Sequence, residues 1–356
     1  MLLFDAHLDL SLNAINFNRD LNRSISEIRE VEAGMTDIMC RGGSTVNFTE
    51  LRRAEIGVCV ATQLAHCKAG DTVVGAWRSP EIAWSITQAQ LVWYRTMEEA
   101  GQMKQIVDRD GLNRHVELWK NGGSDDAPIG YILSLEGADS LITLDYLDRA
   151  YEYGLRALGP AHFGVGRYSP GTFSEGRLTS EGVELVKKMS ELGMILDATH
   201  LTDEAFWHAL EIFDGPVWAS HNNCRALVNH QRQFSDEQFK ALIERGAVIG
   251  SVFDAWMLYP PGWVRGETVR EESGVTIATV VDHVDHLCQL AGNARHCGIG
   301  SDLDGGFGTQ QCPQDLDTIA DLQKLPEIFA SRGYSAEDIE GLFHGNWLRF
   351  LNEAWS

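Results

Sequence analysis

Residues 2–9 read Leu-Leu-Phe-Asp-Ala-His-Leu-Asp, a short apolar run that leads directly into two side chains able to bind a metal or move a proton. Similar short runs recur along the chain, each leading into a residue with a functional side chain. Runs of this length, bounded by Gly, Pro and polar residues, are typical of strands buried on both faces. The eight predicted strands contain residues 2–4, 56–60, 129–133, 155–158, 194–196, 217–219, 248–252 and 297–300.

The segments between these runs carry helix signals. The stretch from Thr179 to Leu192 places five apolar residues near one helical face, and Gly193 is a suitable stop. Ser235 is followed three residues later by Gln238, which fits a capping box at the start of another helix. Strand and helix therefore alternate, which favours an α/β fold. The remaining predicted helices cover residues 80–107, 141–153, 203–212, 276–291 and 336–352.

Polar residues recur at the carboxyl ends of the runs, where a parallel barrel gathers its catalytic side chains around one mouth. The sequence therefore predicts a TIM-like (β/α)8 barrel. Such barrels typically need about 250 residues. The rest of the 356-residue chain fits additional helices and long βα loops, so we expect one domain over residues 1–356. Residues 163–178 are expected to form a mobile loop near the mouth, and residues 254–275 a lid.

Composition excludes several classes of function. Hydrophobic residues make up 44% of the chain, enough for a large core, while the formal net charge of −22 argues against binding nucleic acid or an anionic membrane. The amino-terminal stretch resembles no signal peptide, and no apolar run is long enough to predict a membrane span. The seven cysteines contain no Cys-x-x-Cys pair, which favours reduced thiols in a cytoplasmic protein.

Five residues at or just beyond the ends of predicted strands form a plausible metal-ligand set. His7 and Asp9 are two apart, so a strand directs both side chains to the same face. Glu136 ends a buried run, where a carboxylate is costly to ionise unless it is paired or bound to metal. His200 and His221 close two successive strands. Each residue alone is equally consistent with a polar loop or a hydrogen-bonded core histidine, but their equivalent placement favours a metal site.

Imidazole and carboxylate ligands without a thiolate suit zinc, with manganese or cobalt as substitutes. Five protein ligands exceed the three that usually hold one catalytic zinc, so we expect two ions. A natural partition assigns His7 and Asp9 to one ion, His200 and His221 to the other, and Glu136 to both. With a bridging hydroxide, such a centre keeps a residual positive charge that would attract a carbonyl oxygen and stabilise an oxyanion.

The chain resembles the membrane (renal) dipeptidase family of zinc peptidases, within the amidohydrolase-like barrels. The strongest motifs are Ser-Leu-Glu-Gly at 134–137, Gly-Met-Ile-Leu-Asp-Ala-Thr-His at 193–200, Ser-His-Asn-Asn-Cys-Arg-Ala-Leu at 220–227 and Ile-Gly-Ser-Asp-Leu-Asp-Gly at 299–305. The first metal motif is His-x-Asp where most amidohydrolases carry His-x-His, and the bridge is Glu where many relatives use a modified Lys. Both features resemble the dipeptidases specifically.

The resemblance implies the same five metal ligands and three further roles. His162 would polarise the substrate carbonyl and steady the tetrahedral intermediate. Arg232 would grip the substrate's C-terminal carboxylate, although Gln231 stands where the family usually has Pro. Asp302 would carry a proton from the attacking water to the leaving amine.

The residues themselves leave rival interpretations open. Arg232 could pair with Asp236 on the surface, and His162 could be structural. Asp304 could replace Asp302 as the proton carrier. His66, just beyond the second predicted strand, could also reach the substrate.

The expected function is hydrolysis of small dipeptides at a binuclear zinc centre with a bridging hydroxide nucleophile, including substrates with a C-terminal D-residue. Peptide hydrolysis needs a nucleophile, an anchor for the carbonyl and an acid for the leaving nitrogen, and these residues supply candidates for each. The alternatives are hydrolysis of other amides, such as N-acyl amino acids or lactam rings, and metal binding without turnover. A homodimer would fit the family, and no nucleic-acid or membrane partner is expected.

Overall fold

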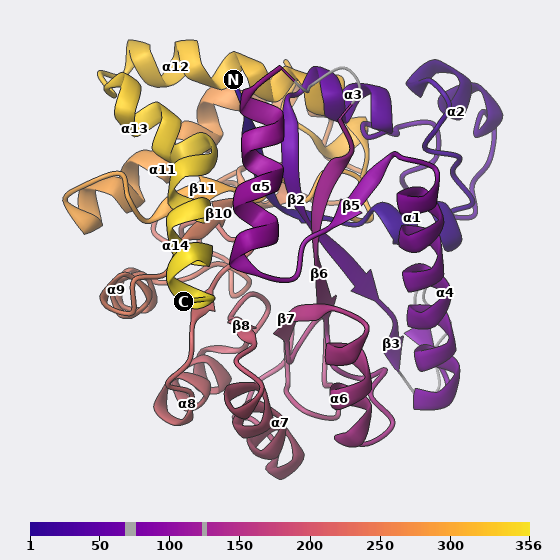
Figure 1. The fold of residues 1–356 in the computed structure, drawn as a ribbon. Coiled ribbons are helices and arrows are strands. Elements are labelled where there is room, and N and C mark those ends of the chain that lie inside the picture. The colour runs from indigo at the N-terminus through magenta and orange to yellow at the C-terminus, as the bar shows by residue number, and fades with distance from the viewer. Residues whose placement is uncertain (68–75, 123–126) are drawn as a thin grey trace.

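Eight parallel strands form a nearly closed barrel, as predicted. The structure is a computed structural model that describes residues 1–67, 76–122 and 127–356. The strand order is β10-β11-β1-β2-β6-β7-β8-β9, and a parallel bridge between Ala219 and Ile249 joins the two ends. All eight predicted strands are confirmed, and helices surround them (Figure 1). The strands are β1 (Leu3–Leu8), β2 (Ile56–Leu64), β6 (Ile129–Glu136), β7 (Leu155–Gly159), β8 (Ile195–Asp197), β9 (Val217–Trp218), β10 (Ile249–Ser251) and β11 (Cys297–Ile299).

The barrel interior is filled by apolar side chains from different strands. Phe4, Val58, Ile132 and Trp218 belong to one buried cluster although they come from four strands. The last helix, α14, adds Trp347, whose ring stacks on Phe4 at 5.7 Å and meets Trp218 edge-on at 5.8 Å. This packing fills the barrel interior. The polar residues at the carboxyl ends of the strands lie at the carboxyl-terminal mouth of the barrel.

A shift in strand register directs His7 toward the mouth. Ala6 belongs to the inner cluster, whereas Leu3 and Leu8 pack in the outer one. Strict alternation would place Ala6 and Leu8 on the same face, but the pairing of β1 with β2 shifts register between Asp5 and Leu8. The irregularity lets the end of β1 present its polar side chains to the barrel opening.

The helices follow the predicted alternation, with capping as expected at Ser235 and Gln238. None of the helices formed by the described residues is long and apolar enough to cross a membrane. The α-helices are α1 (Leu10–Ile15), α2 (Ile25–Val31), α3 (Phe48–Arg53), α4 (Pro80–Glu99), α5 (Arg109–Lys120), α6 (Asp145–Glu152), α7 (Ser180–Glu191), α8 (Asp203–Ile212), α9 (Asp236–Glu244), α10 (Arg270–Ser273), α11 (Ile277–Ala291), α12 (Leu325–Ser331), α13 (Ala336–Glu340) and α14 (Asn346–Ala354). Short helices of other types are η1 (Ala255–Met257), η2 (Thr309–Gln311), η3 (Ile319–Lys324) and the π-helix η4 (Gly341–Gly345).

The predicted helix over residues 80–107 is wrong at its carboxyl end. Helix α4 stops at Glu99, and Gly101 adopts a left-handed φ of 75° that a helix cannot continue through. Residues Met103–Gln105 then form β5, which pairs in parallel with the first half of β6. Helix α5 and the two-stranded sheet of β3 (His66–Cys67) and β4 (Ala76–Trp77) were not predicted either.

Candidate metal centre and active site

The predicted site residues meet at the carboxyl ends of the barrel strands. A cavity of about 570 Å³ opens there. His7 is buried beside it, with Nε2 3.7 Å from Glu136 Oε2 and 3.8 Å from Asp302 Oδ1. The other seven predicted residues line the cavity: Asp9, Glu136, His162, His200, His221, Arg232 and Asp302. The structure therefore brings together all eight residues that the sequence singled out.

Glu136 lies at the centre of the cluster. Its Oε1 is 3.0 Å from Nε2 of His200 and 3.4 Å from Nε2 of His221. Its Oε2 faces the other side, 3.7 Å from Nε2 of His7 and 3.9 Å from Nε2 of His162. The two carboxylate oxygens therefore face two different sets of imidazoles, as a bridging ligand would.

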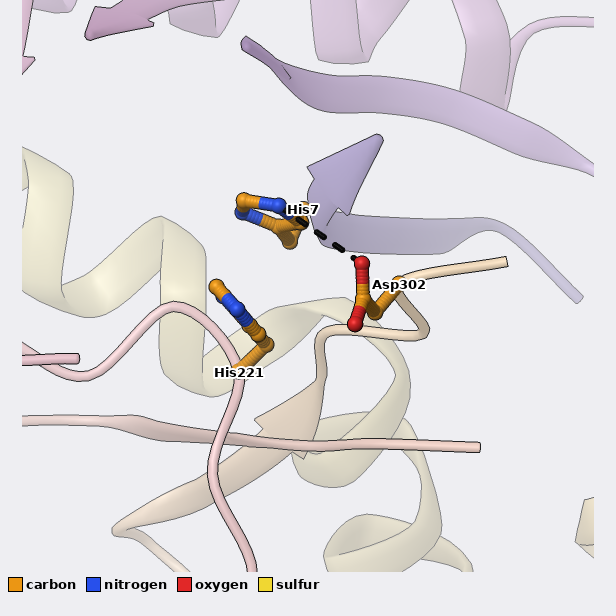
Figure 2. Close-up of side chains that lie close together, drawn as sticks. All are labelled: His7, His221 and Asp302. Atoms are coloured by element: carbon orange, nitrogen blue, oxygen red, sulfur yellow. Dashed lines mark ion pairs between the residues drawn. The ribbon is translucent and has the colours of Figure 1, made fainter. Parts of the chain in front are cut away.

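Asp9 and Asp302 complete the side of the cluster around His7. Asp9 Oδ2 is 3.9 Å and Asp302 Oδ1 is 3.8 Å from Nε2 of His7. Figure 2 shows Asp302, on the loop after β11, beside His7, with His221 facing the same space from the loop after β9. The ligand atoms of His7, His221 and Asp302 lie within 4.8 Å of one another, as do those of His7, Asp9 and Glu136.

Hydroxyl groups hold the outer nitrogens of the imidazoles. Thr172 Oγ1 is 2.9 Å from Nδ1 of His200, and Ser220 Oγ is 2.9 Å from Nδ1 of His221. Burial lowers the pKa of His200 and His221, and it lowers the pKa of His7 to about 3. The charge of Arg232 is a lesser cause for all three imidazoles. Neutral imidazoles oriented in this way present Nε2 to the centre of the cluster, which is the arrangement that metal-binding histidines need.

The carboxyl groups are unfavourable neighbours without a cation. Burial raises the pKa of Asp9 to about 7. Burial also raises the pKa of Glu136, and the charges of Asp9 and Asp302 add to this effect. Among the described residues, His7 Nε2, Asp9 Oδ1 and Glu136 Oε1 are buried without a hydrogen-bond partner. These imidazole nitrogen and carboxylate oxygen atoms lie in one cluster and lack hydrogen-bond partners, which fits a role as ligands of a divalent metal ion.

Arg232 lies in the cavity wall and does not pair with Asp236. Its side chain is buried, and Nη2 donates to the backbone oxygen of His221 at 2.9 Å. Asp236 instead accepts from Nε2 of His286 at 2.8 Å, so the surface-pair interpretation is wrong. Nη1 has no hydrogen-bond partner among the described residues. Burial lowers the pKa of Arg232 to about 10, which leaves the guanidinium charged at neutral pH.

Asp304 is not placed to carry a proton. Its carboxylate is buried and accepts from Ser44 Oγ at 3.0 Å, Thr45 N at 2.8 Å and Val46 N at 3.1 Å. Arg19 approaches it at 3.4 Å. These donors occupy the carboxylate, which ties the loop after β11 to residues 44–46.

Asp302 and Asp304 lie in one turn, and their side chains point to different parts of the structure. Both have left-handed backbone, with φ of 59° and 62°. This conformation is uncommon outside glycine and is tolerated best by Asp and Asn. It turns Asp302 into the cavity and Asp304 away from it.

The two loops predicted near the mouth do contribute to the cavity. Residues 163–178 supply Phe163 and Phe173, and residues 254–275 supply Asp254, Trp256 and Arg265. His66 also lines the cavity, with Nδ1 3.1 Å from Oδ2 of Asp139.

Two buried aspartates that orient the site were not singled out from the sequence. Asp5 Oδ1 accepts from the backbone nitrogen of Ser301 at 2.8 Å, which joins the ends of β1 and β11. Asp197 Oδ1 accepts from the backbone nitrogens of Thr199 and Ser220, both at 3.1 Å, which joins the ends of β8 and β9. The signal available was an Asp two or three residues before a candidate ligand histidine, where its side chain can cap the turn.

A parallel barrel with a buried carboxylate and imidazole cluster at its carboxyl mouth defines the class of metal-dependent hydrolases. Within that class, the chain belongs to the membrane dipeptidase family, peptidase family M19, whose sequence model matches residues 1–355. It is therefore an enzyme, a metallopeptidase that acts on peptide bonds.

Similar proteins agree with this assignment. Dipeptidase tcpJ of Claviceps purpurea is 30% identical over 235 residues, which cover 63% of this chain and 51% of that protein, so the match spans about half the length of that relative. The crystal structure of the metallopeptidase dipeptidase AC has a TM-score of 0.77 at 24% identity, covering 100% of this chain and 99% of that one. A metallopeptidase from Rhodobacter sphaeroides, liganded with a phosphinate mimic of the dipeptide L-Ala-D-Ala, has a TM-score of 0.75 at 21% identity, with coverage of 100% and 99%. These two structures share the barrel fold.

Removal of metal is expected to lower both activity and thermal stability. Without a cation, the charges of Asp9, Glu136 and Asp302 oppose one another's ionisation, and the charge of Arg232 offsets this effect only in part. A ligand that binds only the folded state at 100 times its Kd stabilises that state by about 2.7 kcal/mol. Treatment with a chelator should therefore lower Tm by at least ~5 °C and abolish hydrolysis, and an added divalent metal ion should restore both. Chelator already saturated with the same metal ion is the control, and an unchanged Tm after confirmed metal loss would contradict the expectation.

Proposed function

We propose that this enzyme hydrolyses dipeptides at a binuclear zinc centre. The observation that carries the proposal is the position of Glu136, whose Oε1 faces His200 and His221 while Oε2 faces His7. This supports the partition in which His7 and Asp9 hold one ion, His200 and His221 the other, and Glu136 both. When bound, the ions would supply an activated water and polarise the scissile carbonyl.

Asp302 is proposed to move the proton that hydrolysis requires. Its side chain is partly accessible from the cavity, at 15% exposure, and its carboxylate lies next to the ligand side chain of His7. Burial and the charge of Asp9 raise its pKa, which favours a group that can accept a proton and return it. Asp302 would accept a proton from the attacking water and donate it to the leaving amine as the carbon–nitrogen bond breaks.

His162 is proposed to steady the substrate carbonyl. Burial lowers its pKa, with the charges of His66 and Arg232 as lesser causes, so the ring is neutral and can donate one N–H. Its ring lies 4.7 Å from that of His200, in the wall of the cavity. A neutral donor at this position can stabilise developing oxyanion charge without repelling the metal ions.

Arg232 is proposed to hold the free C-terminal carboxylate of the substrate. It contributes a charged, buried guanidinium to the cavity wall, with Nη1 free of partners in the described part of the chain. A planar fork of donors suits a carboxylate. The anchor at a fixed distance from the metal ligands would limit hydrolysis to short peptides.

Hydrolysis of a dipeptide panel by the zinc-loaded enzyme tests this proposal. The panel crosses L- and D-residues at both positions, because the ligand of the Rhodobacter sphaeroides metallopeptidase mimics L-Ala-D-Ala. We expect cleavage that requires metal and a free C-terminal carboxylate, including substrates with a C-terminal D-residue. Absence of cleavage with two ions confirmed bound would reject the dipeptidase proposal, and cleavage of N-acyl amino acids or lactams instead would identify a different amide substrate.

Replacing Arg232 should separate carboxylate recognition from catalysis. Arg232→Ala is expected to raise KM for free dipeptides by about 10- to 100-fold, the range for losing charged hydrogen bonds, with a smaller effect on C-terminally amidated substrates. Arg232→Lys should restore only part of the loss, because an ammonium lacks the fork. Arg177→Ala is the control, since Arg177 is exposed and pairs with Glu211. Equal effects on free and amidated substrates would remove Arg232 from carboxylate recognition.

A further inference from the structure

Aromatic rings form one wall of the cavity. Phe163, Phe173 and Trp256 all line it, and they come from the two loops at the barrel mouth. The ring of Phe173 lies 5.8 Å from that of Phe163 and 5.9 Å from that of Trp256, and Phe163 and Trp256 are 6.4 Å apart. These rings are close enough to enclose an apolar group between them.

The backbone of Phe173 has a conformation that is unusual for an aromatic residue. Its φ is 65°, in the left-handed region that a bulky residue rarely adopts, and 66% of its surface is exposed. Its backbone nitrogen donates to Oε1 of Gln231 at 2.9 Å. Strained backbone persists where the surrounding structure enforces it, and it concentrates at ligand sites.

Gln231 stands where the family resemblance led us to expect Pro. A proline side chain has no acceptor, so it could not hold the backbone of Phe173 in this way. The departure from the family pattern therefore has a structural consequence: the glutamine connects the Phe163–Phe173 loop to the segment that carries Arg232.

The same short segment joins the aromatic wall to the proposed carboxylate anchor. The backbone nitrogen of Arg232 donates to Nδ1 of His230 at 3.0 Å. The ring of His230 meets that of Trp256 at 4.5 Å and that of Phe173 at 5.5 Å. Arg232 and the three rings line the same cavity, so a substrate whose carboxylate is held by Arg232 can place its C-terminal side chain against these rings.

A second apolar part of the cavity lining comes from a different part of the chain. Leu12, Phe17 and Leu64 belong to one cluster and also line the cavity. They follow β1 or end β2, whereas Arg232 and the aromatic rings follow later strands. The two parts of the lining can therefore receive different residues of a dipeptide.

One cation, Arg265, lies at the aromatic wall and is partly balanced by a carboxylate. Arg265 lies over the ring of Trp256 at 5.7 Å and 3.8 Å from the carboxylate of Asp254. Arg265 and Asp254 line the cavity beside Trp256, and the two phenylalanine rings complete this wall.

We infer that Phe163, Phe173 and Trp256 form the subsite for the side chain of the substrate's C-terminal residue, and that Gln231 positions Phe173 within it. This assignment rests on the proposed dipeptidase function and adds its substrate class: dipeptides with a large apolar, above all aromatic, C-terminal residue.

The test compares kcat/KM for Ala-Phe and Ala-Ala, with both stereoisomers at the C-terminal position. One methylene group more or less in an apolar pocket changes kcat/KM by about 10- to 200-fold, so the native enzyme should favour Ala-Phe over Ala-Ala at least ~10-fold for the better stereoisomer. Phe173→Ala should reduce this ratio by ~10-fold. Gln231→Ala should reduce it in the same direction, and Gln231→Glu, which keeps an acceptor, should preserve most of it.

Val165→Ala is the matched control within the same loop. Val165 is 74% exposed and is absent from the cavity wall, so its replacement should leave the Ala-Phe to Ala-Ala ratio unchanged. If native enzyme cleaves both substrates without preference, or if Phe173→Ala leaves the ratio intact, the subsite inference is wrong while the dipeptidase function stands. If metal-loaded native enzyme cleaves neither dipeptide, the proposed function and the subsite fall together. Trp256→Leu gives an independent test should Phe173→Ala fail to fold.

Discussion

A Glu136→Gln variant is expected to lose bound metal and peptidase activity together. The two oxygens of Glu136 face both halves of the cluster, toward His200 and His221 on one side and His7 on the other. The amide removes a negative charge and replaces one acceptor with a donor that repels a cation. Disturbing groups that only support metal ligands costs about 10- to 100-fold in affinity or activity, so loss of the bridge should cost at least ~100-fold. Metal content per chain and hydrolysis rate, measured on the same preparation, check this.

Glu50→Gln is the matched control for this substitution. Glu50 is as buried as Glu136, each at 8% exposure, but it bonds Arg53 and Thr318 and does not line the cavity. It should lower stability without changing metal content. A Glu136→Gln enzyme that keeps two ions and full activity would reject the bridging role.

An Asp302→Asn variant is expected to keep its metal and lose turnover. Asparagine is nearly isosteric with aspartate but cannot accept and return a proton. General acid–base groups contribute about 10²- to 10⁴-fold, so kcat should fall by ~100-fold or more while KM changes little. Metal content has to be measured alongside kcat, because Asp302 lies close enough to His7 and His221 to be a ligand itself. Loss of an ion in this variant would assign Asp302 to the metal set.

Asp304→Asn separates this effect from damage to the turn. Asp304 lies two residues further along the same turn, but its carboxylate bonds Ser44, Thr45 and Val46. Its replacement should lower Tm, because these hydrogen bonds are weakened, and should have only a small effect on kcat. A normal kcat in Asp302→Asn would move the proton-carrying role to another group of the cavity.

The strands were predictable because both of their faces are buried. In β1, β2 and β6, every residue is buried, so most of the strand sequence is apolar, and polar residues such as Asp5 are those with buried partners. Residues 103–105 lacked this signal: in β5, Met103 is buried but Lys104 is exposed, and the segment pairs only with the first half of β6. The sequence of a short, half-exposed strand that pairs with one neighbour resembles the end of a helix, which explains why the predicted helix extended past the end of α4.

The sequence by itself determined where the metal-site candidates would meet. His7, Glu136, His200 and His221 lie at or just after strand ends, and parallel strands bring their carboxyl ends to one edge whatever the loops do. Sequence position was enough because backbone hydrogen bonding dictates this arrangement.

Only the tertiary structure decided which neighbouring side chains face the cavity. Asp302 and Asp304 are two residues apart in one motif, yet left-handed backbone and the donors from residues 44–46 send their carboxylates to different places. Loops that follow separate strands bury Arg232. They also bring Phe173 next to Trp256 and into a hydrogen bond with Gln231. Contacts of this kind are made between distant segments and carry no local periodicity, so they become visible only when the loops are folded against one another.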